Sequence, residues 1–451
     1  MPTLSDMQAD AVRKVSRWFG DRSKPFFYLA GYAGTGKSTI LPDIIDQCGL
    51  TPSQVAFCAP TGKAAKVMMQ KFKAQGWDVT ATTIHKLIYR KPGEAAERIR
   101  QEVAACHAEV AQLSADLMRL RACDPTPVDE IATKEARLKE VEAAETKASA
   151  KLRKALNDRK SGLTFEFNEE SMVRSKRLVV VDEASMVGID IANDLLSFGI
   201  PVLAIGDPGQ LPPVSEKPGF TQHTPDFFLT EIHRQAADNP IIWLSAQVRQ
   251  GNRVQHGEYG GLVKIIPRKA DNVTTDLTRD LQVICGTHKT RWALTAKIRR
   301  ALGYAAFSAP QANEPILITR NSRQHPALVN GSIVTCMESV TPLVEGEESF
   351  PIKVIDEEDV EYALTLLQAP FEEHVFQRLN AATIADHKLW DARKKYQHAD
   401  FGWVLTCHKS QGSQWDEVVV HDESRSFRDD ADRWLYTAVT RAAERLTVVS
   451  G

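Results

Sequence analysis

The sequence predicts an α/β protein with two doubly wound parallel sheets, one in each half of the chain, and an insertion in each half. The first observation is a series of short apolar runs, each followed by a loop and a helical pattern: FFYLAG, VAFCAP, RLVVVDEAS and PVLAIGD, then DLQVICGTH, GWVLTCHKS, EVVVH and RLTVVS. Continuous apolar runs are typical of parallel strands covered on both faces, and their alternation with helices favours doubly wound domains. The other two observations are the segments that interrupt this alternation.

The first interruption predicts a helical hairpin. Between TIHKLIYRKPG and RLVVVDEAS, apolar residues recur in alternating steps of four and three, which is a heptad pattern. They are Ile99, Val103, Cys106, Val110, Leu113, Leu117 and Leu120. After the breaker CDPTPVD, a second series places Ile131, Leu138, Val141, Ala148 and Leu152 on one side. We expect two antiparallel helices closed at Asp124-Pro125, with their charges on a solvated face.

The second interruption, residues 309–396, predicts a small β module. EPILITRN and LVNGSIVTCMESV are typical of short strands, and they lie around an Asn330-Gly331 turn. A small β-barrel-like module fits this pattern. No internal repeat or low-complexity tract is apparent elsewhere.

Composition bounds the class of protein. A chain of 451 residues with 43% hydrophobic and 25% charged residues is expected to be globular, with two to four domains. No apolar run approaches the roughly 20 residues that span a bilayer, and MPTLSDMQADAVRK lacks the apolar core of a signal peptide. Seven dispersed cysteines without a C-x-x-C pair favour reduced thiols over a zinc site or disulfides. We therefore expect a cytoplasmic protein, of a bacterial or phage-infected cell, with no membrane partner.

Net charge gives only weak information about partners. The formal charge is −2, so the chain as a whole lacks the basic footprint of many nucleic-acid binders. TGKAAKVMMQKFK and RKVSRWFGDRSK are nevertheless locally basic. A basic surface confined to one groove is compatible with both the near-zero net charge and these locally basic segments.

The stretch GYAGTGKS, Gly31 to Ser38, fits the pattern G-x-x-x-x-G-K-[ST] between a strand and a helix. Glycines let backbone N–H groups surround phosphates, and a helix N-terminus favours the negative charge. Lys37 is expected to reach the β- and γ-phosphate oxygens, and Ser38 to bind Mg²⁺. The residues expected to hold the nucleotide are Gly31, Gly34, Thr35, Gly36, Lys37, Ser38 and Thr39. ATP and Mg²⁺ are thus the predicted cofactors.

Carboxylates at the end of another buried run complete a hydrolysis site. RLVVVDEAS supplies Asp182 for Mg²⁺ and Glu183 to orient or deprotonate the attacking water. Gln210, in AIGDPGQLPPV, follows a further strand and has two interpretations: a γ-phosphate sensor, or part of a proline-fixed loop around Asp207. Arg234 and Arg441 lie in the second half of the chain, from which guanidinium groups can stabilise charge on a transferred phosphoryl group.

Taken together, the motifs identify a family resemblance. AGTGKST, APTGKAAK, TIHKLI, VDEASMV, GDPGQLPPV, LTEIHRQ, LTCHKSQGSQWDEVVV and YTAVTRA occur in the order seen in superfamily 1 helicases. The chain resembles the RecD-like (Dda-like), 5′→3′ branch, superfamily 1B, over nearly its whole length except the helical insertion. The resemblance implies two RecA-like P-loop NTPase domains and an ATP-driven DNA helicase, with roles in DNA replication, recombination or repair.

The resemblance also implies residue roles at the nucleotide. Gln8 in LSDMQADAV matches a glutamine that contacts adenine, and Arg234 and Arg441 match γ-phosphate arginines of the second RecA-like domain. Gly412 and Gln414 match a nucleotide-facing turn, although many relatives carry an acidic residue where this chain has Gln414.

Further matches imply a DNA track across both domains. On the first domain the matching residues are Pro60, Thr61, Thr83 and His85. On the second they are Thr406, His408, Lys409, Ser410 and Gln411. Phosphate contacts of this kind give sequence-independent, salt-sensitive binding, and closure of two domains around ATP changes the spacing of the two grips.

The resemblance places the insertions in known positions. GLTFEFNEE resembles a strand-separating pin, which makes Phe165 (or Phe167) a candidate wedge; packing of both phenylalanines under the hairpin is an equal alternative. The implied domains are 1–85 with 171–225 (1A), 86–170 (1B, with the hairpin), 226–308 with 397–451 (2A) and 309–396 (2B, SH3-like). The hairpin could extend the duplex-facing surface or bind a replication or recombination protein.

Several functions remain open at this point. The leading prediction is a monomeric helicase that moves 5′→3′ on single-stranded DNA and acts at single/double-strand junctions. The alternatives are a translocase that strips proteins from DNA or acts on RNA, an ATP-gated clamp, and, from the P-loop alone, a small-molecule kinase.

Overall fold

The computed structural model describes residues 4–90, 94–122, 127–158, 166–214, 216–231, 239–270, 281–304, 308–344, 347–371, 392 and 395–451. The chain separates into two compact units, Met1–Ile84 with Val173–Gly451, and His85–Met172. Within the described residues, no helix has the length and apolar character needed to cross a bilayer. The four-part domain division given above remains a prediction.

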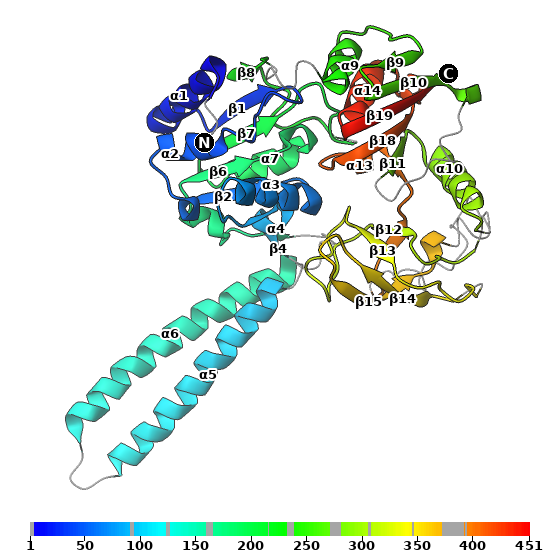
Figure 1. The fold of residues 1–451 in the computed structure, drawn as a ribbon. Helices are drawn as coiled ribbons and strands as arrows, with labels where there is room; N and C mark the ends of the chain where they lie inside the picture. The colour runs from blue at the N-terminus through cyan, green and yellow to red at the C-terminus, as the bar shows by residue number, and fades with distance from the viewer. Residues whose placement is uncertain are drawn as a thin grey trace. The chain divides into compact units, whose positions relative to one another are not determined.

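The first sheet of the larger unit has six parallel strands in the order β3-β2-β6-β7-β1-β8 (Figure 1). They are β1 (Phe26–Gly31), β2 (Val55–Ala59), β3 (Ala81–Thr83), β6 (Leu178–Val181), β7 (Val202–Gly206) and β8 (Phe227–Leu229). The four apolar runs of the first half form β1, β2, β6 and β7. The sheet continues to Leu229 in β8, beyond the predicted boundary at residue 225, because β8 pairs with β1.

Helices cover this sheet where the sequence places caps and apolar faces. They are α1 (Asp6–Asp21), α2 (Leu41–Gln47), α3 (Gly62–Ala74) and α7 (Ile189–Leu196), while α4 (Ile84–Ile88) follows β3 directly and lies almost entirely in the smaller unit. Ser5 and Gln8 form a capping box at the start of α1, and Thr61 caps α3 by accepting from the Ala64 N–H. One apolar cluster joins α1, α2 and α3 to the strands, so the carboxyl ends of β1, β6 and β7 are held at one edge.

The second sheet repeats this plan in the order β17-β11-β18-β19-β10-β9 (Figure 1). Its strands are β9 (Gly257–Tyr259), β10 (Val263–Pro267), β11 (Leu281–Cys285), β17 (Val404–Thr406), β18 (Trp415–His421) and β19 (Ala442–Ser450). All pairs are parallel except β9 with β10 at the edge. The described residues thus contain the two parallel sheets that the apolar runs predicted.

Alternate residues of the second sheet face different helices. The helices are α9 (Pro240–Arg249), α10 (His288–Ala301), α13 (Cys407–Ser410) and α14 (Ala431–Val439). Val418 and Val420 of β18 belong to an apolar cluster with α9 and α14, whereas Val419 between them packs with α10. Because successive side chains of a strand point to opposite faces, helices cover both faces of this sheet.

The second insertion forms a five-stranded antiparallel sheet in the order β15-β14-β13-β12-β16. The strands are β12 (Pro315–Ile318), β13 (Ile333–Cys336), β14 (Ser349–Ile355), β15 (Glu361–Leu367) and β16 (Ala399–Phe401). Its own apolar cluster lies beneath β12 to β16. β16 lies beyond residue 396, and the Asn330-Gly331 turn lies directly before β13.

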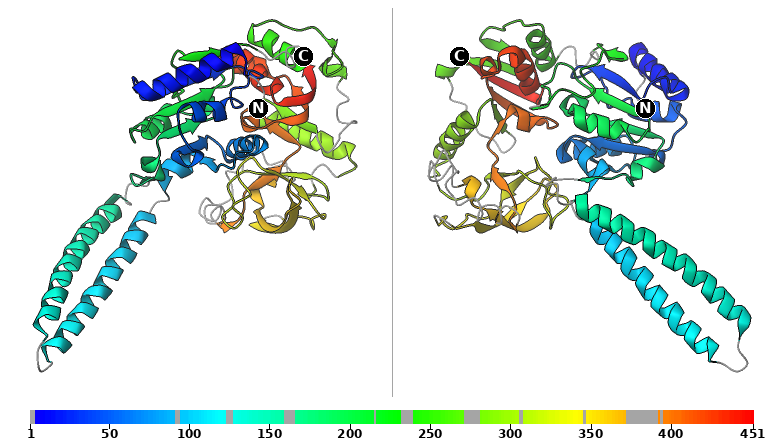
Figure 2. Two further views of the ribbon diagram at one scale, coloured as in Figure 1. Left: turned by 60° about the vertical axis from the view of Figure 1, so that its left-hand side comes forward. Right: turned by 180° about the vertical axis from the view of Figure 1, so that it is seen from behind.

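The smaller unit contains two long helices that run side by side, α5 (Glu94–Arg121) and α6 (Val128–Asp158) (Figures 1 and 2). Leu117, Val141 and Ala148 are buried between them. Ion pairs such as Asp116–Lys134 at 2.9 Å and Glu109–Arg137 at 2.9 Å fix an antiparallel register. The predicted turn at Asp124-Pro125 lies outside the described residues.

At the base of this unit, β4 (Tyr89–Arg90) pairs with β5 (Glu166–Phe167). Phe167 packs edge-on against Tyr89, with ring centroids 6.3 Å apart. Phe165, the first pin candidate, lies outside the described residues.

The described cysteines are free thiols. Burial raises the pKa of Cys48 and of Cys336 to about 11, so these thiols stay protonated near neutral pH. This agrees with the expectation of reduced cysteines; Cys123 lies outside the described residues.

Candidate functional site

A cavity of about 460 Å³ in the larger unit is lined from both α/β domains. The first domain contributes the loop after β1, the carboxylates after β6 and the loop after β7. The second contributes residues between α13 and β18 and between α14 and β19. In parallel sheets, ligands bind beyond the carboxyl ends of strands, which is where the first domain's share lies.

The backbone conformation and close packing of the loop after β1 favour glycine at three positions. Gly34 and Gly36 have φ values of 79° and 74°, a left-handed conformation that favours glycine. A Cβ on Gly31 would come within 2.7 Å of Thr35 Oγ1. Lys37 Nζ donates to the carbonyl oxygen of Tyr32 at 2.8 Å, so the ammonium group lies across the loop.

The helix after this loop starts later than the motif predicts. Residues 38–40 form turns, and α2 begins at Leu41. Pro42 explains the difference because it has no N–H to donate to the carbonyl of Ser38, four residues earlier. Lys37 and Ser38 are therefore followed by turns rather than directly by a regular helix.

Two carboxylates stand opposite the loop. Ser38 Oγ donates to Asp182 Oδ2 at 3.3 Å, and the Glu183 N–H donates to Asp182 Oδ1 at 2.9 Å. Glu183 adopts φ 52° and ψ 42°, a strained backbone for a residue with a side chain. Burial and the Asp182 charge raise the pKa of the Glu183 carboxyl, while Arg441 and Lys37 oppose that rise.

Gln210 lines the same cavity with an unfilled acceptor. Its Oε1 is buried and has no hydrogen-bond partner among the described residues, while the loop is held by the Asp207 carboxylate accepting from the Gly209 N–H at 2.9 Å. A buried, unpaired amide oxygen facing a cavity is a group that awaits a ligand. Each interpretation of this segment is therefore supported by one observation. The loop is fixed around Asp207, and Gln210 faces the pocket.

Arg441 is part of the cavity wall that the second domain contributes. Its guanidinium donates to the carbonyls of Thr437 at 3.0 Å and Ser413 at 3.1 Å and to Thr440 Oγ1 at 3.0 Å. It is buried, and its charge acts on Glu183 across the cavity. Gly412 and Gln414 also line the cavity, Gln414 with an exposed side chain.

Two residues that sequence reasoning missed join the domains at this site. Tyr436 of α14 accepts from the Ala33 N–H at 2.9 Å and donates to Asp207 Oδ2 at 2.6 Å. Arg249, at the end of α9, lies with its guanidinium carbon 3.4 Å from the ring centroid of Tyr32. The only signal for Tyr436 was its place in YTAVTRA, five residues before Arg441; Arg249 gave none.

Two predicted nucleotide residues lie elsewhere. Gln8 is buried and donates from Nε2 to the carbonyl oxygen of Thr35 at 3.3 Å, so it braces the loop from behind. Its predicted contact with adenine remains a prediction. Arg234 lies outside the described residues.

On the first domain, the predicted DNA contacts follow adjacent strand ends. Pro60 and Thr61 follow β2, and Thr83 ends β3, where Ala59 and Thr83 are in register. A Cβ on Gly412 of the second domain would come within 3.4 Å of Thr61 Oγ1, which brings the two domains' motifs together. His85 belongs to the smaller unit, where its ring lies 5.5 Å from that of Tyr89.

On the second domain, the predicted contacts divide into outward and inward side chains. Lys409 is exposed and His408 half-buried, and both lie on α13 after Thr406 at the end of β17. Ser410 is fully buried and donates to the carbonyl of Cys407 at 2.7 Å. Gln411 donates to the carbonyl of Leu211 at 3.1 Å, so its amide links the second domain to the loop that carries Gln210.

The fold and this cavity define a class: a two-domain P-loop nucleoside triphosphatase whose site is completed by the second domain. The "AAA domain" family matches residues 3–264, and the "UvrD-like helicase C-terminal domain" family matches residues 401–449. The chain belongs to the AAA domain family, because the model of that family matches more than half of it, and the C-terminal match agrees with the superfamily 1 helicase resemblance of the motifs.

Two known proteins are similar to nearly the whole of this chain. The "ATP-dependent RecD2 DNA helicase" of Deinococcus radiodurans is 24% identical over 466 residues, which cover 98% of this chain but 48% of that protein. An uncharacterized protein of Acanthamoeba polyphaga mimivirus is 24% identical over 542 residues, covering 96% of this chain and 97% of that one. The chain thus spans about half the length of the Deinococcus relative.

A solved structure shows the same fold. A Pif1 helicase from Bacteroides, in complex with ADP-AlF3 and ssDNA, superposes with a TM-score of 0.50 at 15% identity, covering 100% of this chain and 93% of that one. The two parallel sheets of this chain are therefore RecA-like domains.

Proposed function

We propose that this chain is an ATP-dependent helicase that moves 5′→3′ on single-stranded DNA and separates duplex. The observation that carries the proposal is the cavity in which Lys37 and Glu183 face Arg441 of the other domain. The named activity of the RecD2 relative, and the ssDNA held by the Pif1 structure, support DNA as the substrate.

The chain's own residues suit hydrolysis of a γ-phosphoryl group. Lys37 is free to exchange its bond to the Tyr32 carbonyl for phosphate oxygens, and Arg441 meets charge that develops in the transition state. Glu183 accepts a proton from the attacking water, and the amide of Gln210 positions that water.

Ser38 and Asp182 fit Mg²⁺. A hydroxyl and a carboxylate 3.3 Å apart are hard oxygen ligands beside the phosphate loop, the donor type that this cation prefers. When bound, the ion supplies charge neutralisation of the phosphate oxygens.

Coupling to DNA follows from the contacts between domains. Gln411 and Tyr436 tie α13 and α14 to the loops that line the nucleotide pocket. The exposed Lys409 lies on α13, two residues before Gln411. A change in domain spacing on hydrolysis therefore moves one set of strand contacts relative to the other.

The test is ATP-dependent unwinding of duplexes that carry either a 5′ or a 3′ single-stranded tail. We expect opening of the 5′-tailed duplex alone. Opening of the 3′-tailed duplex alone contradicts the polarity. Strand-stimulated ATP hydrolysis without opening contradicts unwinding and indicates a translocase or a clamp.

Lys37→Ala tests the site itself. We expect turnover to fall at least about a hundredfold because a cation on the phosphates is removed. Lys24→Ala, an exposed lysine paired with Asp226, is the matched control and is expected to keep full turnover. A Lys37→Ala chain that hydrolyses ATP normally contradicts the site assignment.

A further inference from the structure

The N-terminal end of α3 meets the five-stranded sheet of the second insertion, which we call the β module. A Cβ on Gly62 would come within 2.7 Å of Val329 Cβ, and a Cβ on Gly331 within 3.6 Å of Lys63 Cβ. Because atoms at such separations leave no gap, a strand cannot pass between the two segments. Gly62 and Lys63 directly follow Thr61, a predicted strand contact of the first RecA-like domain.

An acidic turn of the β module reaches the same end of α3. Residues 356–359 read Asp-Glu-Glu-Asp and join β14 to β15. Glu358 forms an ion pair of 2.9 Å with Lys66. Burial lowers the pKa of the Lys63 ammonium group, and the negative charge of Glu357 opposes that change. Two acids of the turn thus act on two lysines of the basic segment TGKAAKVMMQKFK.

Hydrogen bonds give the acidic turn a fixed shape. β14 and β15 pair in continuous antiparallel register over their full length. Beyond these pairs, Asp356 Oδ1 accepts from the backbone N–H groups of Glu358 at 2.9 Å and Val360 at 3.0 Å. The side chain of Asp356 is therefore used within the turn, and the hairpin presents Glu357 and Glu358 at its tip.

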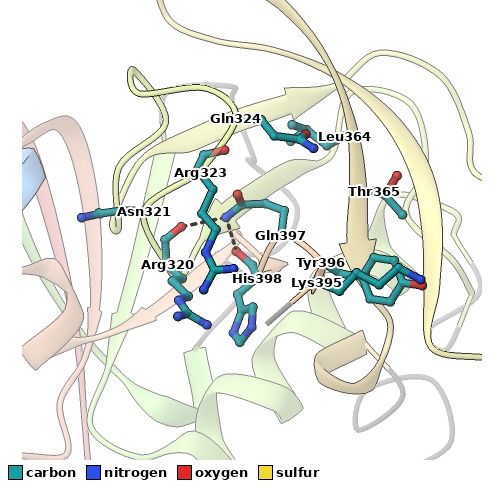
Figure 3. Close-up of a pocket in the computed structure, with 11 residues that line it drawn as sticks. Arg320, Asn321, Arg323, Gln324, Leu364, Thr365, Lys395, Tyr396, Gln397 and His398 are labelled. Carbon is teal, nitrogen blue, oxygen red and sulfur yellow. Dashed lines mark hydrogen bonds between the residues drawn. The ribbon is translucent and has the colours of Figure 1, made fainter. Parts of the chain in front are cut away.

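The loop after β12, which makes the contact with Gly62, is also held on the β module. Gln397, two residues before β16, donates from Nε2 to the carbonyl of Arg320 at 2.7 Å, one of the dashed lines in Figure 3. Further along the loop, the Asn330 N–H donates to Asn321 Oδ1 at 2.7 Å. The loop and the acidic turn are thus fixed parts of one module.

Buried ion pairs attach the β module to the second RecA-like domain. Arg299 of α10 pairs with Glu314, directly before β12, at 2.7 Å, and both side chains are fully buried. Arg291 of the same helix pairs with Asp400 of β16 at 2.6 Å. Breaking a buried pair leaves an uncompensated charge, so this attachment is strong. The module therefore follows the second domain, and its contact with α3 opens when the two RecA-like domains separate.

The contact between the acidic turn and α3 is, by contrast, easily broken. The side chains of Lys66 and Glu358 are 31% and 62% exposed, and exposed ion pairs are weak and screened by salt. The phosphates of a single strand are also anions, so they compete with the acidic turn for Lys63 and Lys66. The turn and a strand therefore exclude each other at this end of α3.

We propose that the acidic turn 356–359 is an autoinhibitory latch, which neutralises Lys63 and Lys66 and covers the approach to Thr61 until a single strand displaces it. The inference rests on the proposed function, because that function supplies the strand. Separation of the two RecA-like domains opens the latch, and the phosphates of the strand then keep it open.

The first experiment measures binding of fluorescein-labelled oligo(dT) to the full chain, without ATP, over a range of salt concentrations. Glu357→Gln with Glu358→Gln should bind about fivefold more tightly than wild type at low salt, the upper end for one exposed ion pair. The difference should vanish at high salt, which screens the wild-type latch. The matched control, Glu347→Gln with Glu361→Gln, removes the same charge from exposed positions of the β module and should bind like wild type. Equal affinity of the two variants overturns the proposal.

A disulfide tests the geometry of the latch. Lys63→Cys with Gly331→Cys places two Cβ atoms 3.6 Å apart, which suits a disulfide. The oxidised variant should lose binding of both linear and circular single-stranded DNA, and reduction should restore both. Oxidised wild-type chain is the control for the native cysteines.

Three results of the disulfide experiment overturn the latch. One is unchanged binding after oxidation. Another is loss of circular DNA alone, since linear DNA then threads beneath a contact that closes over the strand. The third is failure of the disulfide to form in a variant that binds DNA when reduced, which contradicts the contact itself.

Failure of the latch is distinguishable from failure of the proposed function. A wild-type chain that binds oligo(dT) but opens neither tailed duplex contradicts the helicase proposal alone. A wild-type chain that unwinds, while Glu357→Gln with Glu358→Gln binds no more tightly than its control, contradicts the latch alone.

Discussion

The two halves of the nucleotide pocket are built differently. On the first domain, the polar contacts stay within one domain: Lys37 bonds to Tyr32 of the same loop, and Ser38 after β1 reaches Asp182 after β6 of the same sheet. On the second domain, Tyr436 makes its hydroxyl contacts entirely with the opposite domain. The Lys37 and Ser38 contacts thus lie within the first domain, whereas the hydroxyl of Tyr436 in the second half is positioned by contacts between the domains.

The difference assigns separate tasks to the two halves. A group that is fixed within one domain contributes to nucleotide binding whatever the domain spacing. A group that bridges domains acts only when the domains are close, so it couples turnover to movement. Substitutions in the second half should therefore lower turnover more than they lower nucleotide affinity.

The largest effect is expected from Arg441→Ala. Removing a guanidinium that meets transition-state charge costs about 10³-fold or more in kcat, while nucleotide affinity changes little. Single-turnover ATP hydrolysis and nucleotide titration measure the two quantities. Arg445→Ala, four residues on and exposed, is the control. An equal loss of affinity and turnover contradicts the division of tasks.

Tyr436→Phe should give the next largest effect. It leaves the Ala33 N–H and the Asp207 carboxylate without their shared partner, and a hydrogen bond to a charged group is worth about 1.5–3 kcal/mol, or about tenfold to a hundredfold in kcat. The pocket keeps its shape because only one oxygen is lost.

Tyr362→Phe is the matched control, because it removes a Tyr–Asp bond of 2.9 Å, to Asp356, far along the chain in the third sheet. Combining Tyr436→Phe with Asp207→Asn should give less than the sum of the single effects, since both remove one interaction. Additive effects contradict the bridge.

The sequence predicts the first domain's half of this site better than the contacts between the domains. The strands that position Lys37, Asp182 and Glu183 were predictable because continuous apolar runs end at each of them. β8 was not predictable, because a strand of three residues is too short to show a hydrophobic period. The late start of α2 was not predicted either, because it depends on the missing N–H of Pro42. Tyr436 and Arg249 could not be placed, since their contacts span 403 and 217 positions and leave no spacing pattern.

A smaller effect concerns pH. Burial and Asp182 raise the pKa of the Glu183 carboxyl, so its proton is held to a higher pH than the ordinary value of 4.5. Protonated Glu183 cannot accept a proton from water. The acid limb of kcat/KM should therefore lie above pH 4.5, with activity lost as pH falls through it.

Glu183→Gln should remove the acid limb from the pH profile of kcat/KM, and the variant should hydrolyse ATP at a much lower rate. Glu170→Gln is a useful contrast, because Arg98 lowers the pKa of that exposed carboxyl and it lies in the smaller unit. It is expected to leave the profile unchanged. A Glu183→Gln chain that retains the wild-type acid limb contradicts Glu183 as the group that titrates.

Thr437→Val should have the smallest effect of these substitutions. It therefore tests most finely whether Tyr436 alone couples the two domains. The Leu211 N–H loses its bond to Thr437 Oγ1, 2.9 Å long, but Gln411 still holds the Leu211 carbonyl at 3.1 Å. One neutral hydrogen bond is worth about 1 kcal/mol, so kcat should fall less than tenfold, with nucleotide affinity unchanged. Thr437→Ser keeps the hydroxyl and should restore turnover. A loss as large as that of Tyr436→Phe would mean that the domains are coupled through the whole 207–211 loop rather than through the tyrosine.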